Sequence, residues 1–343
     1  MYWYILLFLI SIFLGAFWER KDNTSKSLIT LFLFLIVWIF VGFKYEVGSD
    51  SLSYLRIYQE VSEYEGIKWK FPDFSYYLLN AFSIWLEFNI QFVYVVVGFF
   101  ISYFTIRSAT QININPCYFF AIIMPFHIVM LGISGVRQGV AESIYLYGIS
   151  NLLLNNKNGF TKSIIAAVTF HTSAIFFSVF YFITSKKRYF FIALLILIPF
   201  LFIIGRDNYG HYSEISLYNQ GIFLRVGYLI CMGILMVGIT FFIKFNGILE
   251  KRLSIVIIIS GPVLSLLGIM NSTLSDRISY YFILLATIFI MHLLAINNIR
   301  LKKYIIPIML SLSFISLLAF CFFGNARESY EYNNYLFYLL GEV

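Results

Sequence analysis

The chain has 343 residues, of which 60% are hydrophobic and only 12% are charged. Soluble domains carry about 25% charged residues, so this composition excludes an ordinary water-soluble enzyme and favours a membrane as the solvent. The net charge of +7 is not concentrated in a basic run interleaved with aromatic residues, which argues against nucleic acid as a partner. We attribute it instead to loops on the cytoplasmic side of a membrane.

Apolar runs follow one another along the whole chain. Most approach the ~20 residues that a helix needs to cross ~30 Å of hydrocarbon. Backbone groups in lipid must be hydrogen-bonded within the chain, and the alternation typical of a membrane barrel is absent, so we expect helices. The sequence predicts a single all-α domain over residues 1–343, a polytopic membrane bundle of about 10–12 transmembrane helices. The runs are residues 1–18, 28–43, 74–86, 90–106, 117–133, 138–154, 163–184, 189–205, 226–245, 255–270, 280–297 and 304–324.

The first of these runs resembles a secretory signal peptide in position only. No basic residues precede it, and no small-residue cleavage site follows it. We therefore expect residues 1–18 to be a retained span.

The distribution of Lys and Arg predicts the orientation of the bundle. Placing the basic clusters on the cytoplasmic side puts both termini on the opposite, outer side of the membrane. The two longest loops, 44–73 and 206–225, then lie outside as well. The clusters are residues 20–26, 186–188, 244–252 and 300–303.

One region conflicts with this orientation if every run crosses the membrane, because Lys157 and Lys162 would then lie outside. The conflict disappears if the short run 74–86 does not cross and 163–184 is re-entrant around His171. Re-entrant backbone is tolerated where protein or a wet cavity surrounds it. We expect this second arrangement.

The run 138–154 begins with polar residues at membrane depth. Arg137 immediately precedes it, and Gln138, Glu142 and Tyr145 share one helix face by their spacing. A charged side chain at this depth costs roughly 2.5–3.5 kcal/mol on insertion scales and usually faces a cavity or the bundle interior. The alternative is an interfacial arginine with a structural Gln–Glu pair.

Three further segments place polar residues beside apolar runs, and each has a structural alternative. Asp50 opens a short amphipathic stretch and could simply cap its helix. His171 lies inside the run 163–184 and could be a satisfied structural group. Asp276 and Arg277 precede an aromatic segment and could form an interfacial ion pair.

The order of these four motifs resembles that of the EpsG/Wzy-type polysaccharide polymerases, a family of bacterial surface-glycan assembly. The resemblance extends over essentially the whole chain, including a tyrosine-rich end. Each motif is short, so the specificity lies in their order. The matching residues are Gly48-Ser49-Asp50 with Tyr54, Arg137-Gln138-Gly139-Val140-Ala141, Phe170-His171-Thr172-Ser173-Ala174, and Asp276-Arg277 with Tyr280-Tyr281-Phe282.

This chain departs from the family pattern at two positions. Ser49 stands where threonine is common, which preserves the hydroxyl group. Gly139 stands where a larger residue often follows Arg-Gln, which predicts a looser start of that helix.

The resemblance implies a glycosyltransferase of the bacterial inner membrane. The sequence shows no nucleotide-binding motif and no cluster of metal ligands, so we expect a reaction that needs no cofactor and no metal. The enzyme would join oligosaccharide repeat units carried on undecaprenyl diphosphate, at the periplasmic face, to make O-antigen of lipopolysaccharide, capsule or exopolysaccharide. Its expected partners are that lipid-linked oligosaccharide, membrane lipid, and a flippase and a chain-length regulator of the same pathway. The diphosphate leaving group calls for cationic side chains, and the acceptor hydroxyl benefits from a base.

The resemblance also implies roles for individual residues. Arg137 and Arg277 would hold the diphosphate, and Gln138 would orient phosphate or sugar oxygens. His171 or Asp50 would be the base, and the residues leave this choice open. The other expected substrate contacts are Tyr54, Glu142, Arg206, Arg225 and Tyr281.

Three other functions were weighed against the polymerase. A lipid-linked glycan flippase usually shows two similar halves, and none are visible here. A membrane acyltransferase that modifies sugars could use His171 but would leave Arg137 unexplained. An O-antigen ligase shares the chemistry and stays open as an alternative.

Overall fold

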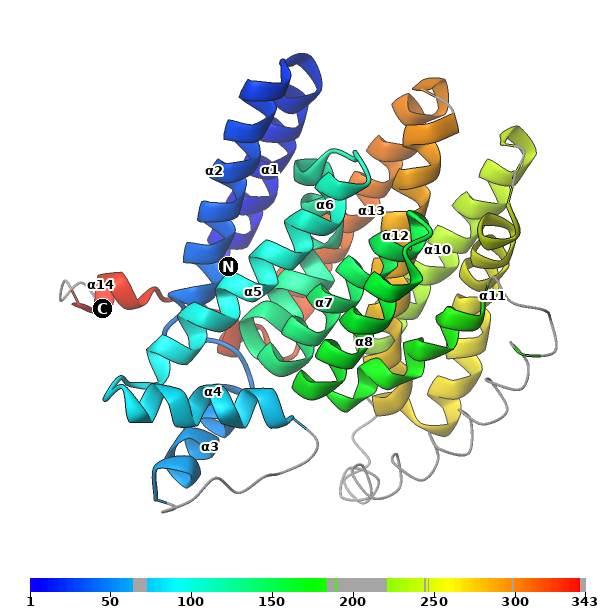
Figure 1. Cartoon of the computed structure of the whole chain (residues 1–343). Helices are drawn as coiled ribbons and strands as arrows, with labels where there is room; N and C mark the ends of the chain where they lie inside the picture. The colour runs from blue at the N-terminus through cyan, green and yellow to red at the C-terminus, as the bar shows by residue number, and fades with distance from the viewer. Residues whose placement is uncertain are drawn as a thin grey trace.

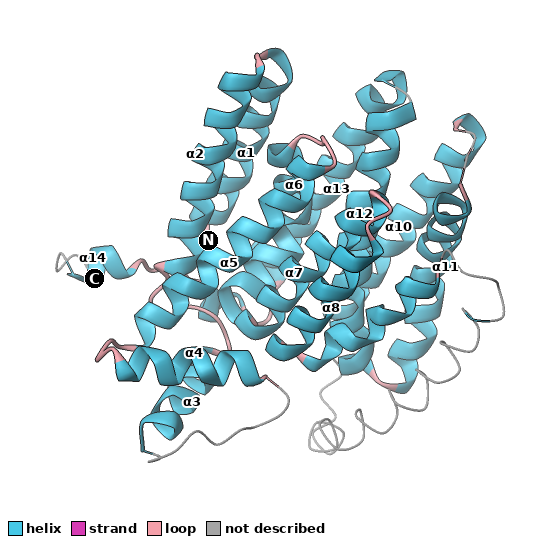
Figure 2. Cartoon of the chain, in the orientation of Figure 1, coloured by secondary structure: helices cyan, strands magenta, loops and turns pink. Residues whose placement is uncertain are grey.

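The computed structural model describes residues 1–63, 73–183, 189, 221–243, 245, 247–297 and 299–339. These residues are mainly helical and contain no strand (Figure 2). Lys44 and Asn334 form an isolated antiparallel bridge. The expectation of an all-α membrane bundle is therefore confirmed.

Eight helical segments in the described part of the chain are long and apolar enough to cross a membrane. The run 189–205 lies outside the described residues except for Tyr189. The π-helix η1 directly continues α6, and the two form one span. The spanning segments are α1 (Tyr2–Arg20), α2 (Asn23–Gly42), α5 (Ile90–Gln111), α6 (Pro116–Ile123) with η1 (Met124–Ser134), α10 (Gly221–Phe242), α11 (Ile248–Met270), α12 (Ser272–Asn297) and α13 (Ile299–Phe323).

The remaining elements are shorter or more polar than these spans. Helix α7, which is 18 residues long, contains the polar motif that begins at Arg137. The other elements are α3 (Ser51–Glu63), α4 (Phe74–Trp85), α7 (Val136–Leu153), α8 (Lys157–Phe170), η2 (Thr172–Phe182), η3 (Arg327–Tyr330) and α14 (Tyr335–Leu339).

Most of the described basic residues lie at one end of the bundle, the upper end in Figure 1. Contacts tie the helix termini together there: Glu19 at the end of α1 accepts a hydrogen bond from Lys302 at the start of α13 over 2.7 Å. Asn115, just before α6, also donates to Glu19 over 3.1 Å. We call this the basic end. Its described Lys and Arg residues are Arg20, Lys21, Lys26, Arg107, Lys157, Lys162, Lys251, Arg252, Arg300, Lys302 and Lys303.

The opposite end is formed by the C-terminus of α2, by α3 and α4, by the start of α7 and by the junction of α11 with α12 (Figure 1). We call it the site end. Helix α4 has 12 residues, which makes it about 18 Å long. It lies across the direction of α2 and α5 in Figure 1. This length and orientation match the expectation that the run 74–86 does not cross.

Helices α8 and η2 form a hairpin that begins and ends at the basic end. The Lys157 ammonium lies 5.4 Å from the centre of the Tyr181 ring. Arg252 donates to the carbonyl oxygen of Ile183 over 2.5 Å. Between the two helices His171 has an extended backbone, with φ −158° and ψ 125°. The helix break at His171 is the geometry expected of a re-entrant segment.

Close helix crossings depend on glycine at two places. A Cβ added to Gly98 on α5 would come within 2.6 Å of the Gly42 backbone on α2, so these helices need the small residues that favour close packing. A Cβ on Gly139 would lie 3.1 Å from the Leu131 carbonyl group. Gly139 therefore allows tight packing of α7 on η1, and the expectation of a looser helix start stays a prediction.

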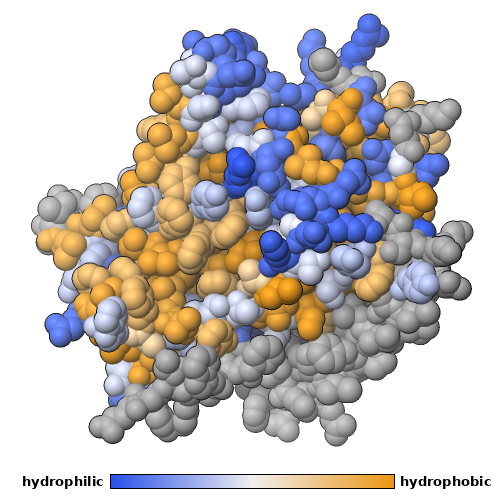
Figure 3. Space-filling view, in the orientation of Figure 1, coloured by the Kyte–Doolittle hydropathy of each residue, from blue (hydrophilic) through white to orange (hydrophobic). Residues whose placement is uncertain are grey.

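The outer surface is apolar where a soluble protein would be polar. Leu9 and Phe13 on α1 and Leu31 and Phe32 on α2 are all more than half exposed. On the face in Figure 3, hydrophilic residues gather over the upper helix ends, and hydrophobic residues cover much of the surface below them. Such a large apolar surface is suited to contact with lipid.

Candidate functional site

All four motifs meet at one cavity of about 290 Å³ at the site end. The loop after α2, the start of α7, the break at His171 and the first turns of α12 each contribute polar side chains to it. We call it the polar cavity. Its polar lining residues are Ser49, Asp50, Tyr54, Ser134, Arg137, Gln138, His171, Thr273, Asp276, Arg277, Tyr280 and Tyr330.

The loop that carries Asp50 is fastened to the end of η1. Gly48 has φ +101°, and a Cβ there would lie 2.7 Å from the Ile133 carbonyl oxygen, so glycine is required. The hydroxyls of Ser49 and Ser134 are 2.9 Å apart, and the Asp50 N–H donates to the Ser134 hydroxyl over 3.2 Å. The first motif is thereby held against the residues that precede Arg137.

The Asp50 carboxylate lines the polar cavity. No backbone N–H donates to it among the described residues, although it immediately precedes α3. The helix-cap alternative for Asp50 is therefore not what the structure shows. The side chain is exposed and can meet a substrate group.

Lys44 supports the same junction. Its ammonium donates to the carbonyl oxygens of Gly132, over 3.3 Å, and of Ile133. These carbonyls lie in the last turn of η1. Lys44 is 3% exposed, and burial lowers its pKa to about 7 while the Asp50 carboxylate opposes that shift.

Arg137 is held by a carboxylate that the sequence did not indicate. Its Nη1 donates to Asp73 Oδ2 over 2.5 Å, and its guanidinium lies 5.5 Å from the centre of the Tyr54 ring and 6.0 Å from that of Tyr76. Burial raises the pKa of Asp73, although Arg137 opposes the shift. A lone aspartate before the run 74–86 is indistinguishable from a loop charge, so only the fold could identify it.

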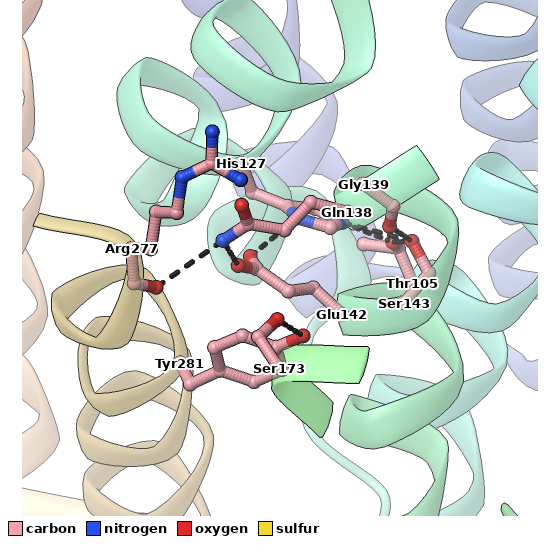
Figure 4. Close-up of polar contacts among 9 residues, drawn as sticks. All are labelled: Thr105, His127, Gln138, Gly139, Glu142, Ser143, Ser173, Arg277 and Tyr281. Atoms are coloured by element: carbon pink, nitrogen blue, oxygen red, sulfur yellow. Dashed lines mark hydrogen bonds and ion pairs between the residues drawn. The ribbon is translucent and has the colours of Figure 1, made fainter. Parts of the chain in front are cut away.

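Gln138 is oriented by two acceptors (Figure 4). Its Nε2 donates to Glu142 Oε1 over 2.8 Å and to the Arg277 carbonyl oxygen over 3.2 Å. A flipped amide would place its oxygen against two other oxygens, so this orientation is the favoured one. Both amide hydrogens are used, and Gln138 offers the cavity only its oxygen, an acceptor suited to a sugar hydroxyl rather than a phosphate.

Glu142 was expected to contact substrate, but it is fully buried and does not line the polar cavity. Its Oε2 lies 3.5 Å from His127 Nδ1. His127 Nε2 is in turn 3.1 Å from the Thr105 hydroxyl and 3.0 Å from that of Ser143 (Figure 4). Glu142 thus holds the Gln138 amide from the buried side of the cavity wall. It belongs to a buried polar cluster with His127, a histidine that stands alone in the sequence.

His171 reaches the polar cavity with one ring nitrogen and is 8% exposed. Its Nδ1 accepts from the Ser173 N–H over 3.2 Å and lies 2.7 Å from the Ser173 hydroxyl. Its Nε2 is 3.5 Å from Arg277 Nη1. The side chain therefore caps η2 and also faces the cavity, so the structural and functional interpretations both apply.

Tyr281, expected to contact substrate, is buried behind His171 instead. Its hydroxyl lies 2.8 Å from that of Ser173, and its ring stacks on Phe177 at 4.3 Å between centres. The neighbouring Tyr280 lines the polar cavity. The motif thus places its two tyrosines on different sides of α12.

The carboxylate of Asp276 pairs with Arg225 on α10, and the alternative of an ion pair between Asp276 and Arg277 is wrong. The Arg225 guanidinium also lies 4.7 Å from the centre of the Tyr280 ring. Arg225 itself does not line the polar cavity, whereas Arg277 does. Arg206, the remaining expected contact, lies outside the described residues.

The segment after α13 supplies another wall of the cavity. Tyr330 lines it, and the Tyr330 carbonyl accepts from the Tyr4 hydroxyl over 2.9 Å. The Gly48 N–H donates to the Ser329 carbonyl over 2.7 Å, and the Tyr45 N–H donates to that of Asn333 over 3.0 Å. Tyr330 directly precedes the tyrosine-rich end noted in the sequence, residues 332–339, none of which lines the cavity.

The fold and this cavity define a multi-pass helical membrane protein with a site rich in arginine, carboxylate and hydroxyl groups at one end. The model of the EpsG family matches residues 27–339. The chain belongs to the EpsG family, and the resemblance seen in the motifs is confirmed. Membership indicates a glycosyltransferase-like polysaccharide polymerase of exopolysaccharide biosynthesis. No curated protein and no solved structure matches the chain.

Proposed function

We propose that the chain joins oligosaccharide repeat units carried on undecaprenyl diphosphate at the periplasmic face of a bacterial inner membrane. The product would be an O-antigen, a capsule or an exopolysaccharide. The observation that carries this proposal is the convergence of Arg137, Arg277, His171 and Asp50 on one polar cavity. A flippase that delivers the lipid-linked units and a chain-length regulator would be its partners.

The side of the membrane is inferred from charge. Most of the described Lys and Arg residues lie at the basic end, which favours a cytoplasmic location for that end. The polar cavity lies at the other end, where flipped lipid-linked units would be presented. Loops 44–73 and 206–225 are then periplasmic.

The reaction proposed is a displacement at the sugar carbon that bears the diphosphate. The acceptor hydroxyl gives its proton to a base, either Asp50 or His171, and its oxygen forms the new bond to that carbon. The bond from that carbon to the diphosphate oxygen breaks, and the diphosphate leaves with the electron pair. Arg137 and Arg277 stabilise the charge that develops on it through charge-assisted hydrogen bonds.

Arg137 would exchange one anion for another during substrate binding. Its guanidinium is already held near the cavity by Asp73 and is 27% exposed. Little side-chain ordering is then left to occur when the diphosphate arrives. The acceptor glycan would meet Gln138 Oε1 and the cavity tyrosines Tyr54 and Tyr280.

The lipid-linked glycans of cells that lack this chain test the proposal. A polymerase predicts accumulation of one repeat unit on lipid, whereas full-length but unattached polymer would indicate a ligase. Wild-type chain should restore the polymer ladder. Arg56→Ala, a change of an exposed arginine on α3 at the same end, should restore it too and serves as the matched control.

Cysteine labelling tests the proposed orientation. Single cysteines at positions 53 and 158 would report on the site end and the basic end. An impermeant thiol reagent, applied to cells with a permeabilised outer membrane, should label only position 53. Labelling of position 158 alone would reverse the orientation and remove the proposed substrate from reach of the cavity.

A further inference from the structure

We propose that His171 donates a hydrogen bond to a phosphate oxygen together with Arg277, and that it is not the base of the reaction. This inference rests on the proposed function and assigns one residue its role within it. The hydrogen bonds of the His171 imidazole select one neutral tautomer. With His171 as a donor, Asp50 is the base.

The Nδ1 atom of His171 must be an acceptor. The backbone N–H of Ser173, in the first turn of η2, donates to it over 3.2 Å. Ser173 is 5% exposed, so this N–H has no access to bulk water if the bond is lost, and buried backbone donors are nearly always paired. A proton on Nδ1 would point at that N–H. The neutral ring therefore carries its proton on Nε2.

The hydroxyl groups behind the ring agree with this tautomer. The Tyr281 hydroxyl can donate to the Ser173 oxygen, 2.8 Å away, and the Ser173 hydroxyl can donate to Nδ1 over 2.7 Å. The Ser173 N–H and the Ser173 hydroxyl then share the one lone pair of Nδ1. The chain Tyr281–Ser173–His171 holds the ring with its Nε2–H towards the polar cavity.

Nε2 of His171 also faces a donor. Arg277 Nη1 points a hydrogen at it over 3.5 Å. That contact is longer than the two at Nδ1, 2.7 and 3.2 Å, so Nδ1 keeps the acceptor role and two N–H groups face each other in the cavity that both residues line. Two donors at this separation can share one oxygen placed about 2.9 Å from each. A diphosphate supplies such an oxygen, and its negative charge strengthens both hydrogen bonds. The pair His171–Arg277 is therefore a site for a phosphate oxygen.

This role removes His171 as a base, because the one nitrogen that reaches the cavity already carries a proton. Two other carboxylates nearby do not offer an acceptor in the cavity: Asp276 pairs with Arg225, and Asp73 is not among the residues that line the cavity. Asp50 lines the cavity with an exposed side chain. The acceptor hydroxyl therefore transfers its proton to Asp50 and bonds to the sugar carbon as the diphosphate leaves.

The tautomer can be measured directly on the full chain. The sequence has four histidines, and loss of one signal in His171→Gln identifies the His171 imidazole in the nitrogen NMR spectrum of isotope-labelled protein in phosphatidylcholine nanodiscs. We expect the Nε2–H tautomer at neutral pH. The Nδ1–H tautomer would overturn the proposal whatever the activity of the chain.

Inorganic pyrophosphate serves as the probe of the donor pair. Its addition should shift the His171 Nε2 signal, and Arg277→Gln should reduce that shift. Absence of a shift in the wild-type protein would contradict the proposal. The same shift produced by phosphatidylglycerol nanodiscs without pyrophosphate would assign the pair to a lipid headgroup and overturn the diphosphate assignment.

Variants at both candidate bases complete the test in the polymer assay. Glutamine places an N–H near the position of Nε2, so His171→Gln should stay within about ten-fold of the wild-type rate. Asp50→Asn should lose the roughly 10²–10⁴-fold that a general base contributes. Two results together would show that His171 is the base. Asp50→Asn would stay active, and His171→Gln would be as inactive as His171→Phe. Arg137→Ala tests the proposed function separately, since it leaves the tautomer unchanged.

Discussion

Two Arg–Asp pairs lie at the site end, and they differ in what surrounds them. Arg137 and Asp73 are 27% and 14% exposed at the edge of the polar cavity. Arg225 and Asp276 are 6% and 12% exposed, and the guanidinium of that pair is enclosed further by Tyr280. The first arginine can exchange its carboxylate for an incoming anion, whereas the second is confined to its partner. Similar pairs thus have a binding role in one place and a structural role in the other.

The largest effect is expected at the accessible arginine. Arg137→Ala should abolish polymer formation, because removal of one preorganised donor to developing charge commonly costs roughly 10²–10³-fold in rate. The protein should still insert at the wild-type level. Arg137→Lys should also be poor, since an ammonium cannot reproduce the planar fork of the guanidinium. A normal polymer ladder from the alanine variant would place diphosphate binding elsewhere.

The enclosed pair should instead affect stability. Asp276→Asn leaves the Arg225 charge buried without its carboxylate, and loss of one partner of such a pair costs about 3–5 kcal/mol. We expect a lower melting temperature in detergent and less protein in the membrane. Unchanged stability with lost polymer would show that this pair, too, acts on substrate.

Asp73→Asn tests whether the carboxylate partner of Arg137 competes with an incoming anion. It removes the charge that competes for Arg137 while keeping a side chain of similar size. Pyrophosphate should bind about 1.5- to 5-fold more tightly, the range expected of a partly exposed ion pair. Titration of purified Asp73→Asn and wild-type protein measures this. Weaker binding in the variant would mean that Asp73 positions Arg137 rather than competing for it.

Lys44 extends the comparison to a buried cation that bonds carbonyls instead of a carboxylate. Its pKa is about 7 in the folded protein, against about 10.4 in an unfolded chain. Between these values only the unfolded state holds the proton, so this group makes the folded state more stable as pH rises from about 7 to about 10. The melting temperature of the wild type should rise relative to that of Lys44→Met over this range. Parallel curves would show that Lys44 stays charged when folded.

Part of the fold could be predicted from the sequence because it depends on local pattern. Apolar runs predict helices, because a helix in lipid makes all its backbone hydrogen bonds within itself. Basic clusters predict which helix termini lie on the same side of the membrane. The conflict at Lys157 was enough to indicate a break near His171. Gly48 could be matched as part of a motif, but the positive φ that requires glycine there is a property of the folded loop.

The partners within the site could not be predicted, because they depend on which helices lie side by side. Nothing in the sequence distinguishes Arg225 from Arg277 as the partner of Asp276. In the sequence Asp73 is one charge at the end of a long loop, and Tyr330 is one of several tyrosines near the C-terminus. The fold brings both of them to the start of α7: Asp73 pairs with Arg137, and Tyr330 lines the same cavity as Arg137.

Reconstitution with a lipid-linked substrate tests the central claim most directly. Purified chain in nanodiscs, supplied with undecaprenyl-diphosphate-linked repeat units, should produce longer lipid-linked glycans and release one undecaprenyl diphosphate for each new glycosidic bond. Arg137→Ala protein in the same nanodiscs should release none. Release by the variant at the wild-type rate, or glycan growth by the wild type without release of undecaprenyl diphosphate, would contradict the claim that the polar cavity carries out polymerisation.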